Sequence, residues 1–311
     1  MLDVRRMRVL REVAARGSFS AAAEALDYTQ SAVSQQIAAL EREAGTILVE
    51  RSARGVRLTD AGRALVAHAD VILARLADAE AELEAIAGLR GGRLRMAAFP
   101  SAGASIMPEA IARYRERHPA IELSLEPAEP GPALAKLRSG EVDIALDITV
   151  AFRPEPDDGI DRLHLLDDPM YVALPANHPL AHKRGLKLDE LADESWILGS
   201  TNSCPDASVF LRACQLAGFE PHIAFNSDDY YAMQGFVAAG VGASFIPDLA
   251  LMPVRDDIVV RSLGARPPIR RIMAATLKDS FRSPAKLAML DVLTEVGDEF
   301  AGKHRRLALV S

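Results

Sequence analysis

The chain has 311 residues, of which 49% are hydrophobic and 25% charged. This length predicts two or three domains and is ample to bury a sizeable interior. Its only two cysteines, Cys204 and Cys214, exclude a disulfide-stabilised scaffold and favour a reducing compartment. No signal-peptide pattern follows Met1, and no apolar run approaches the roughly 20 residues that a membrane span needs. We therefore expect a cytoplasmic protein with no membrane contact.

The net charge of −7 is unevenly distributed along the chain. Residues 1–63 hold ten arginines, no lysine and eight acidic residues, so the remainder carries the whole negative excess. A weakly basic segment attached to an acidic body suits a small nucleic-acid-binding domain, although the charge alone does not establish one.

Residues 1–58 predict three helices followed by a hairpin. Apolar residues recur at helical spacing over residues 1–16, and a glycine follows them. A second, serine-capped helix is expected over residues 18–26 and a third over residues 29–43. Two helices joined by a tight turn, the second with a polar outer face, are typical of a helix-turn-helix. The alternating, arginine-rich residues 46–58 predict a β-hairpin wing.

The third helix predicts a DNA-reading surface. Because Val33, Ile37 and Leu40 face inward, hydroxyl and amide side chains face outward, and glutamine can pair bidentately with adenine. The wing arginines suit contacts with phosphate or the minor groove. The alternatives are a solvated helix face and ordinary surface arginines. The expected DNA-binding residues are Gln30, Ser31, Ser34, Gln35, Arg42, Arg51, Arg54 and Arg57.

Residues 59–90 predict a long linker helix that ends at a glycine pair. Its apolar residues follow one another in alternating steps of four and three, which is a heptad seam. Alanine at two seam positions favours close contact between two helices, so we expect a homodimer rather than packing on the helix's own domain. The seam residues are Leu65, Ala69, Ile72, Leu76, Ala79, Leu83 and Ile86.

Residues 91–311 alternate between strands and helices, which predicts an α/β domain with a mostly parallel sheet. Strands are expected over residues 93–99, 121–126, 142–147, 170–174, 196–198, 222–225 and 243–246. Helices are expected over residues 103–117, 132–139, 206–217, 228–239 and 284–299.

No catalytic residue, metal or cofactor is predicted. The histidines have no metal-ligand spacing, and Ser200 and Ser203 lack both a nearby histidine and a nucleophile elbow. Gly240 and Gly242 precede no phosphate-loop lysine, so we expect a close-packed turn there.

Two polar turns predict a ligand site in this domain. Residues 100–103 and 200–203 each follow a strand and begin a helix, and open α/β sheets bind ligands at such ends. Helix N-termini favour anions, whereas Asp228 adds an acid nearby. A small amphoteric metabolite, such as an amino acid or a hydroxy acid, would suit this combination, although each side chain could simply cap a helix. The expected effector-binding residues are Ser101, Ala102, Ser200, Thr201, Asn202 and Asp228.

The chain resembles the LysR-type transcriptional regulators. The resemblance is dense in the first sixty residues and looser behind them. Its N-terminal motifs are Gly17-Ser18-Phe19-Ser20, Gln30-Ser31-Ala32-Val33-Ser34 and Leu58-Thr59-Asp60-Ala61-Gly62. Its C-terminal motifs include Leu94-Arg95-Met96, Gly140-Glu141-Val142-Asp143-Ile144-Ala145 and Ala239-Gly240-Val241-Gly242. The sequence departs from the family at Val49, where an aromatic residue is usual, and has no lysine before Lys136.

The resemblance implies a winged helix-turn-helix domain (1–58), a linker and dimerisation helix (59–90) and a two-lobed α/β effector domain (91–311) like a type 2 periplasmic binding protein. Lobe I would comprise about 91–162 and 268–311, and lobe II about 163–267, with two crossing strands between them. Such a protein is a ligand-responsive, sequence-specific transcription regulator. It binds double-stranded operator DNA as a homodimer or homotetramer, and its effector alters the arrangement of the paired DNA-binding heads.

Three alternatives remain at this point. Peroxide-sensing members of the family carry a cysteine pair in the region of Cys204 and Cys214, which makes a thiol redox sensor one alternative. Ten helical residues rise about 15 Å, whereas a disulfide requires Cα atoms within about 7 Å, so two inert thiols are favoured. A non-regulatory solute-binding protein and an enzyme of the α/β class are the others.

Overall fold

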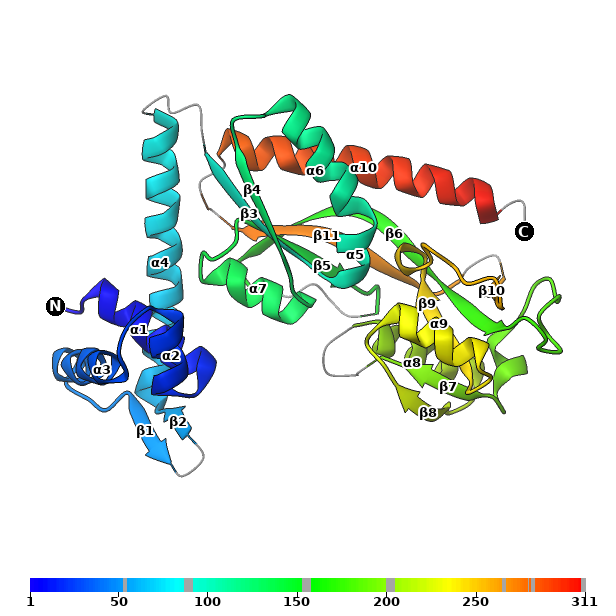
Figure 1. Ribbon diagram of the computed structural model, residues 1–311, viewed down its shortest axis with the longest axis horizontal. Helices are drawn as coiled ribbons and strands as arrows, with labels where there is room; N and C mark the ends of the chain where they lie inside the picture. Colours follow the sequence, from blue (N-terminus) through cyan, green and yellow to red (C-terminus); the bar gives the residue numbers. More distant parts are fainter. Residues whose placement is uncertain are drawn as a thin grey trace. The chain divides into compact units, whose positions relative to one another are not determined.

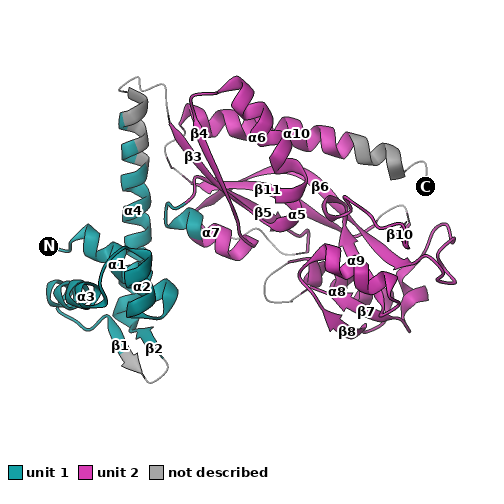
Figure 2. Cartoon of the chain, viewed as in Figure 1, with its two compact units in different colours: residues 1–88, 136–141 teal, residues 89–135, 142–311 magenta. Residues whose placement is uncertain are grey.

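The computed structural model describes residues 1–52, 55–86, 92–152, 158–199, 205–264, 267–278, 280 and 283–308. The chain divides into two compact units (Figure 2). The N-terminal unit comprises residues 1–88 with 136–141, and the C-terminal unit comprises residues 89–135 with 142–311. Within the described residues, no helix is both long enough and apolar enough to cross a membrane.

The N-terminal unit contains the three predicted helices, α1 (Val4–Arg16), α2 (Phe19–Ala25) and α3 (Gln30–Ala44) (Figure 1). Each begins at a side-chain cap, because the oxygens of Asp3, Ser18 and Thr29 accept hydrogen bonds from backbone amides of the first turn. The buried residues come from all three helices and form one core: Leu10, Val13, Ala22, Val33, Ile37 and Leu40.

The predicted wing is an antiparallel hairpin of β1 (Val49–Ser52) and β2 (Gly55–Leu58). Val49 is buried in the core of the unit, so an aliphatic side chain occupies the position where an aromatic was expected from the family pattern. Helix α4 (Asp60–Ile86) follows the hairpin.

The start of α4 explains the Leu58–Gly62 motif physically. The Thr59 hydroxyl donates to the Ile47 carbonyl at 2.8 Å and accepts from the Gly62 amide at 3.0 Å. A Cβ atom on Gly62 would lie 2.1 Å from the Leu48 carbonyl oxygen. Only glycine therefore allows the first turn of α4 to pack this closely on the chain before the wing.

The C-terminal unit is built on nine strands in the order β4-β3-β5-β11-β6-β9-β7-β8, with β10 paired to β6. One end of the order contains β3 (Arg93–Ala98), β4 (Glu122–Pro127), β5 (Ile144–Thr149) and β11 (Ile269–Leu277). The other contains β7 (Ser195–Leu198), β8 (His222–Asn226), β9 (Ala243–Pro247) and β10 (Ile258–Ser262). We refer to these two ends as lobe I and lobe II.

One long strand, β6 (Ile160–Pro175), joins the two lobes. Residues 160–169 pair with β11, whereas residues 170–175 pair with β9 and β10. The sheet is mixed, because β6 runs antiparallel to all three of these partners. The strand expected at residues 170–174 is the second half of this longer strand, which begins just before the lobe boundary expected at about residue 163.

The helices that cover the sheet are α5 (Pro100–Ala104), α6 (Ile106–Arg117), α7 (Pro130–Arg138), α8 (Pro205–Ala217), α9 (Tyr230–Ala238) and α10 (Pro284–Ala308). The single helix predicted over residues 103–117 is in fact two. It begins earlier because Pro100 occupies the first helical position, and Ser105 interrupts it by donating its hydroxyl to the Ser101 carbonyl at 2.6 Å.

Each lobe has its own core. Lobe I buries Met96, Ile106, Tyr114, Ile272 and Val292 among others. Lobe II packs the rings of Trp196, Phe210 and Phe245 against one another in tilted pairs. A Cβ on Gly242 would lie 2.4 Å from the Ser195 carbonyl oxygen, so the close-packed turn predicted for this glycine motif is confirmed.

Candidate DNA-binding surface and effector site

One face of helix α3 is polar and largely exposed to solvent, whereas the opposite face packs into the core of the N-terminal unit. Gln30, Ser31, Gln35 and Arg42 are exposed, and Ser34 is half-buried. The helical period placed Ser31, Ser34, Gln35 and Arg42 outward, together with Ala38, which is also exposed. On β2, Arg57 is also exposed. The side chain of Arg51 and the whole of Arg54 lie outside the described residues.

The inner side of α3 is held by a polar network. Glu41 Oε1 accepts hydrogen bonds from the Leu48 and Val49 amides at 2.9 and 3.2 Å, which ties the helix to the start of the wing. Arg6 on α1 donates Nε to Gln36 Oε1 at 3.2 Å and forms an ion pair with Glu43. These contacts orient the exposed face of α3 relative to the wing.

The heptad seam of α4 divides into two parts. Leu65 and Ala69 pack on the core of the N-terminal unit, and Ala69 is fully buried there. Further along, Ile72, Leu76 and Leu83 are 36%, 46% and 66% exposed. Ala79 is exposed as well, and the side chain of Ile86 lies outside the described residues. Packing on its own domain therefore accounts for the first two seam positions and leaves Ile72, Leu76, Ala79 and Leu83 exposed in the single chain.

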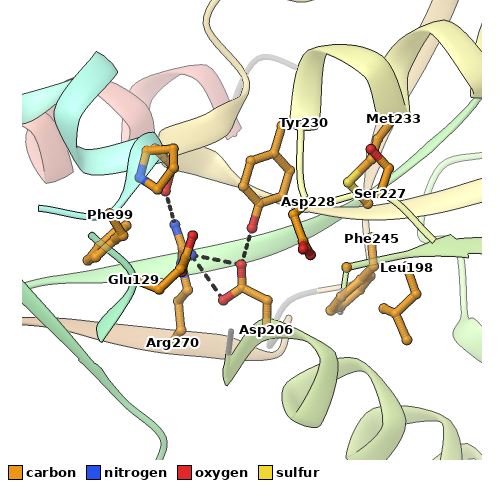
Figure 3. A pocket seen from close by; sticks show the side chains of 13 residues that line it. Phe99, Glu129, Leu198, Asp206, Ser227, Asp228, Tyr230, Met233, Phe245 and Arg270 are labelled. Carbon is orange, nitrogen blue, oxygen red and sulfur yellow. Dashed lines mark hydrogen bonds and ion pairs between the residues drawn. The ribbon is translucent and has the colours of Figure 1, made fainter. Parts of the chain in front are cut away.

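A pocket in the C-terminal unit takes its walls from both lobes (Figure 3). Lobe I contributes residues around the N-terminus of α5 and the loop before α7, and lobe II contributes the ends of β7 and β8 with the first turns of α8 and α9. The lining residues are Phe99, Pro100, Ser101, Glu129, Leu198, Gly199, Asp206, Ser227, Asp228, Tyr230, Met233, Phe245 and Arg270.

Arg270, on β11, is fully buried at this pocket and binds residues of both lobes. Its Nε donates to Asp168 Oδ2 on β6 at 2.8 Å. Its Nη1 donates to both carboxylate oxygens of Asp206 on α8 at 2.9 and 2.8 Å, and its Nη2 donates to Ser101 Oγ on α5 at 2.8 Å. Tyr230 donates its hydroxyl to the same Asp206 carboxylate. A single guanidinium thus joins α5, α8 and the crossing strand.

Burial raises the pKa of two acids here. It raises the pKa of Asp168 to about 6, although the Arg270 guanidinium and the Leu249 amide act in the opposite direction. The pKa of the half-buried Glu129 is also raised, first by burial and then by the negative charges of Asp206 and Asp228. The pocket is therefore acidic apart from one fully engaged arginine.

A wider groove adjoins this pocket. It lies between α5, the first turn of α9 and the segment from Leu249 to Pro253, and it shares Pro100, Ser101, Asp228 and Tyr230 with the pocket. Its further walls include Asp229, Tyr231, Gln234 and Met252.

The predicted effector residues are distributed unevenly. Ser101 and Asp228 line both the pocket and the groove, and the Ser101 hydroxyl already accepts from Arg270. Ala102 is fully buried in the lobe I core and lines neither. The predicted residues Ser200, Thr201 and Asn202 lie outside the described residues.

Sequence patterns did not point to Glu129, Asp206 and Arg270 as pocket residues. Asp206 resembles an ordinary acidic residue in a helix first turn, and Arg270 lies within a strand at the far end of the chain. An arginine among apolar strand residues was a usable signal, because a charge in a buried strand requires a partner.

The described residues contain no cluster of His, Cys, Asp and Glu that could hold a metal ion. Cys214 is fully buried on α8, and burial raises the pKa of its thiol to about 12. Cys204 lies outside the described residues.

A winged helix-turn-helix, a long helix and a two-lobed α/β domain with an inter-lobe pocket define a DNA-binding transcription regulator with an effector-binding domain. The comparisons identify the family. Residues 4–63 match the bacterial regulatory helix-turn-helix protein, lysR family, and residues 87–298 match the LysR substrate binding domain. The chain belongs to the LysR-type transcriptional regulators.

The chain is 32% identical over 301 residues to the probable HTH-type transcriptional regulator LrrA of Synechococcus elongatus, covering 96% of this chain and 98% of that one. It is 34% identical over 312 residues to a probable hydrogen peroxide-inducible genes activator of Mycobacterium avium, covering 96% and 94%. Among solved structures, a full-length OxyR variant from Pseudomonas aeruginosa is similar, with a TM-score of 0.71, 26% identity and coverage of 94% and 95%.

Proposed function

We propose that the exposed face of α3 reads a specific operator in the major groove, and that a small molecule in the inter-lobe pocket controls the arrangement of two such heads. The observation that carries this proposal is the Arg270 network, which joins both lobes at the pocket. A ligand that contacts both walls would favour one lobe arrangement over another and so shift the population of conformations. The site of action would be the cytoplasm, where operator DNA lies.

The operator should be a pseudo-palindrome with half-sites about one helical turn apart, because paired recognition helices enter the major groove on one face. Gln35→Ala should weaken operator binding by about 1–3 kcal/mol and relax sequence preference. Gln215→Ala is the matched control, since Gln215 is an exposed glutamine on α8 of the C-terminal unit. A gel-shift series in which Gln35→Ala leaves affinity and sequence preference unchanged would contradict this register.

The exposed part of the α4 seam is proposed as the dimer contact. Leu76→Asp would place a charge in that contact and separate the dimer, with a loss of operator affinity of roughly 10²–10⁴-fold because two linked heads bind better than one. Ala67→Asp, on the opposite side of the helix, should leave both the dimer and the operator affinity unchanged. Light scattering that shows the same oligomer for Leu76→Asp and the unmodified protein would refute this seam. A tetramer built by further contacts is proposed from the family resemblance.

The effector would be a small metabolite. Ser227→Phe, which fills the pocket, and Thr201→Val, two positions after Gly199 in the sequence, should abolish effector response in a promoter assay and leave operator affinity nearly unchanged. Loss of operator binding in both variants, or an unchanged response in both, would show that the effector binds elsewhere.

The thiol redox alternative has weaker support. One relative is named for hydrogen peroxide, yet Cys214 is buried and its raised pKa keeps it a thiol at neutral pH.

A further inference from the structure

The charge of the pocket restricts what can bind in it. Arg270 is the only cation among the described lining residues, and all three of its nitrogens already donate to Asp168, Asp206 and Ser101. The guanidinium is therefore fully engaged within the protein rather than directed at the carboxylate of a ligand. Two carboxylates already outweigh its single positive charge.

Glu129 and Asp228 add to this negative excess. The Glu129 carboxylate accepts no hydrogen bond from any residue that the structure describes, and it lies in the pocket wall close enough to Asp206 and Asp228 for like-charge repulsion. Among the described lining residues, no lysine and no second arginine neutralises these acids. A bound anion would meet repulsion here, whereas a cation would relieve it.

The cavity sizes indicate how such a ligand would lie. The inner pocket encloses a cavity of about 30 Å³, which is more than the roughly 10–15 Å³ that a cavity needs to hold one water molecule. The adjoining groove encloses about 400 Å³ and offers Tyr230, Tyr231 and Met252 as walls. An ammonium group fits the inner pocket, and an apolar or aromatic body fits the groove, where the tyrosine faces can also attract the cation.

We propose that the effector is an amine whose ammonium head lies between Glu129, Asp206 and Asp228 and whose body lies in the groove beside Tyr230 and Tyr231. This inference rests on the proposed function, since it assigns a ligand class to the same pocket. The sequence predicted an amphoteric metabolite. The proposal restricts that ligand class to compounds with a positively charged group, because the described residues recognise that group.

The test compares ligands of equal size and opposite charge on the full chain. Binding of phenethylamine, 2-phenylethanol and 3-phenylpropanoate is measured by calorimetry at pH 7.5, together with the aliphatic pair pentylamine and hexanoate. We expect each amine to bind at least tenfold more tightly than its neutral or anionic counterpart. Glu129→Gln and Asp228→Asn should each weaken amine binding about fivefold or more. Glu122→Gln, an exposed acid on β4, is the control and should have no effect.

The outcomes separate the two proposals. If a carboxylate binds as tightly as its amine and Ser227→Phe abolishes that binding, the pocket is the effector site and the amine proposal is wrong. If binding of every compound survives Ser227→Phe, the pocket itself is wrong. Failure of both amines to bind the unmodified protein also overturns the amine proposal.

Discussion

The two units of this protein present their proposed functional residues in opposite ways. In the N-terminal unit, the residues of α3 proposed to read DNA lie within a short stretch of sequence, and all but the half-buried Ser34 are exposed to solvent. In the C-terminal unit, the pocket collects side chains from Phe99 to Arg270, and its central arginine is fully buried. A surface that must meet a rigid polyanion can be built on one helix. A pocket that must respond to a small molecule requires groups from separate elements, so that binding alters how those elements sit.

The largest expected effect concerns the buried charge of the C-terminal unit. Arg270→Met should lower the free energy of unfolding by about 3–5 kcal/mol, because it leaves the Asp168 and Asp206 carboxylates buried without their partner. Urea unfolding followed by the fluorescence of Trp196, the only tryptophan, reports directly on lobe II.

Arg271→Met is the matched control for this comparison. Arg271 is the next residue on β11, yet its side chain is 45% exposed and its nearest acid, Asp167, is 3.9 Å away. Its loss should change the free energy of unfolding by less than about 0.5 kcal/mol. Equal effects of the two substitutions would show that the buried network does not stabilise the C-terminal unit.

The N-terminal unit depends on close packing rather than on buried charge. Gly62→Ala should destabilise it by about 1–3 kcal/mol, because the new methyl group would meet the Leu48 carbonyl oxygen. Gly103→Ala in α5 is the control, since a Cβ there meets no atom within 4 Å, and it should be neutral or slightly stabilising. Circular dichroism during thermal unfolding measures both. A Gly62→Ala protein as stable as Gly103→Ala would refute the close approach.

The difference between a surface on one helix and a pocket assembled from distant segments also explains how much of each unit could be predicted from the sequence. The helices of the N-terminal unit follow from local signals such as the serine that caps α2, and these predictions are confirmed. The outward face of α3 also followed from helical period. The motif at Leu58–Gly62 was recognisable only as a family feature until the contact with Leu48 showed its cause.

The pocket could be predicted only in part, because it is assembled by tertiary structure. The turn at Pro100–Gly103 and Asp228 were identified from strand ends, which are local features. The Arg270 network was not, since it joins positions about 100 and 170 residues apart in sequence. Local patterns likewise could not show that β6 is one continuous strand, because exposed residues at 163, 164 and 167 interrupt the buried pattern in its first half.

A smaller effect tests the electrostatics of the crossing strand. The pKa of Asp168 is about 6 in the folded protein, whereas the ordinary value for an aspartate is 3.8. The folded state therefore binds the proton more tightly than the unfolded state does. The contribution of this carboxyl to stability should therefore increase as the pH falls from 7 to 5, by about 1 kcal/mol. Asp168→Asn removes the titrating group. The difference in unfolding free energy between the two proteins should shift in favour of the unmodified protein at pH 5, and a difference independent of pH would contradict the raised pKa.

The smallest expected effect concerns Cys214. Because this thiol is buried, we expect it to react hardly at all with electrophiles or peroxide in the native protein. Its side chain is fully buried in the lobe II core, and a thiol with a pKa of about 12 is almost entirely protonated at pH 7.5. Since the thiolate is the species that reacts with electrophiles and peroxide, Cys214 should react in the native protein at a small fraction of its rate in urea. Cys204→Ser leaves Cys214 as the only thiol, so mass spectrometry after brief N-ethylmaleimide treatment measures that site alone. We expect little label in native protein, full label in urea, and unchanged operator affinity after mild peroxide. Rapid native labelling, or a peroxide-induced Cys204–Cys214 disulfide that changes promoter output in the unmodified protein, would instead favour the thiol redox sensor.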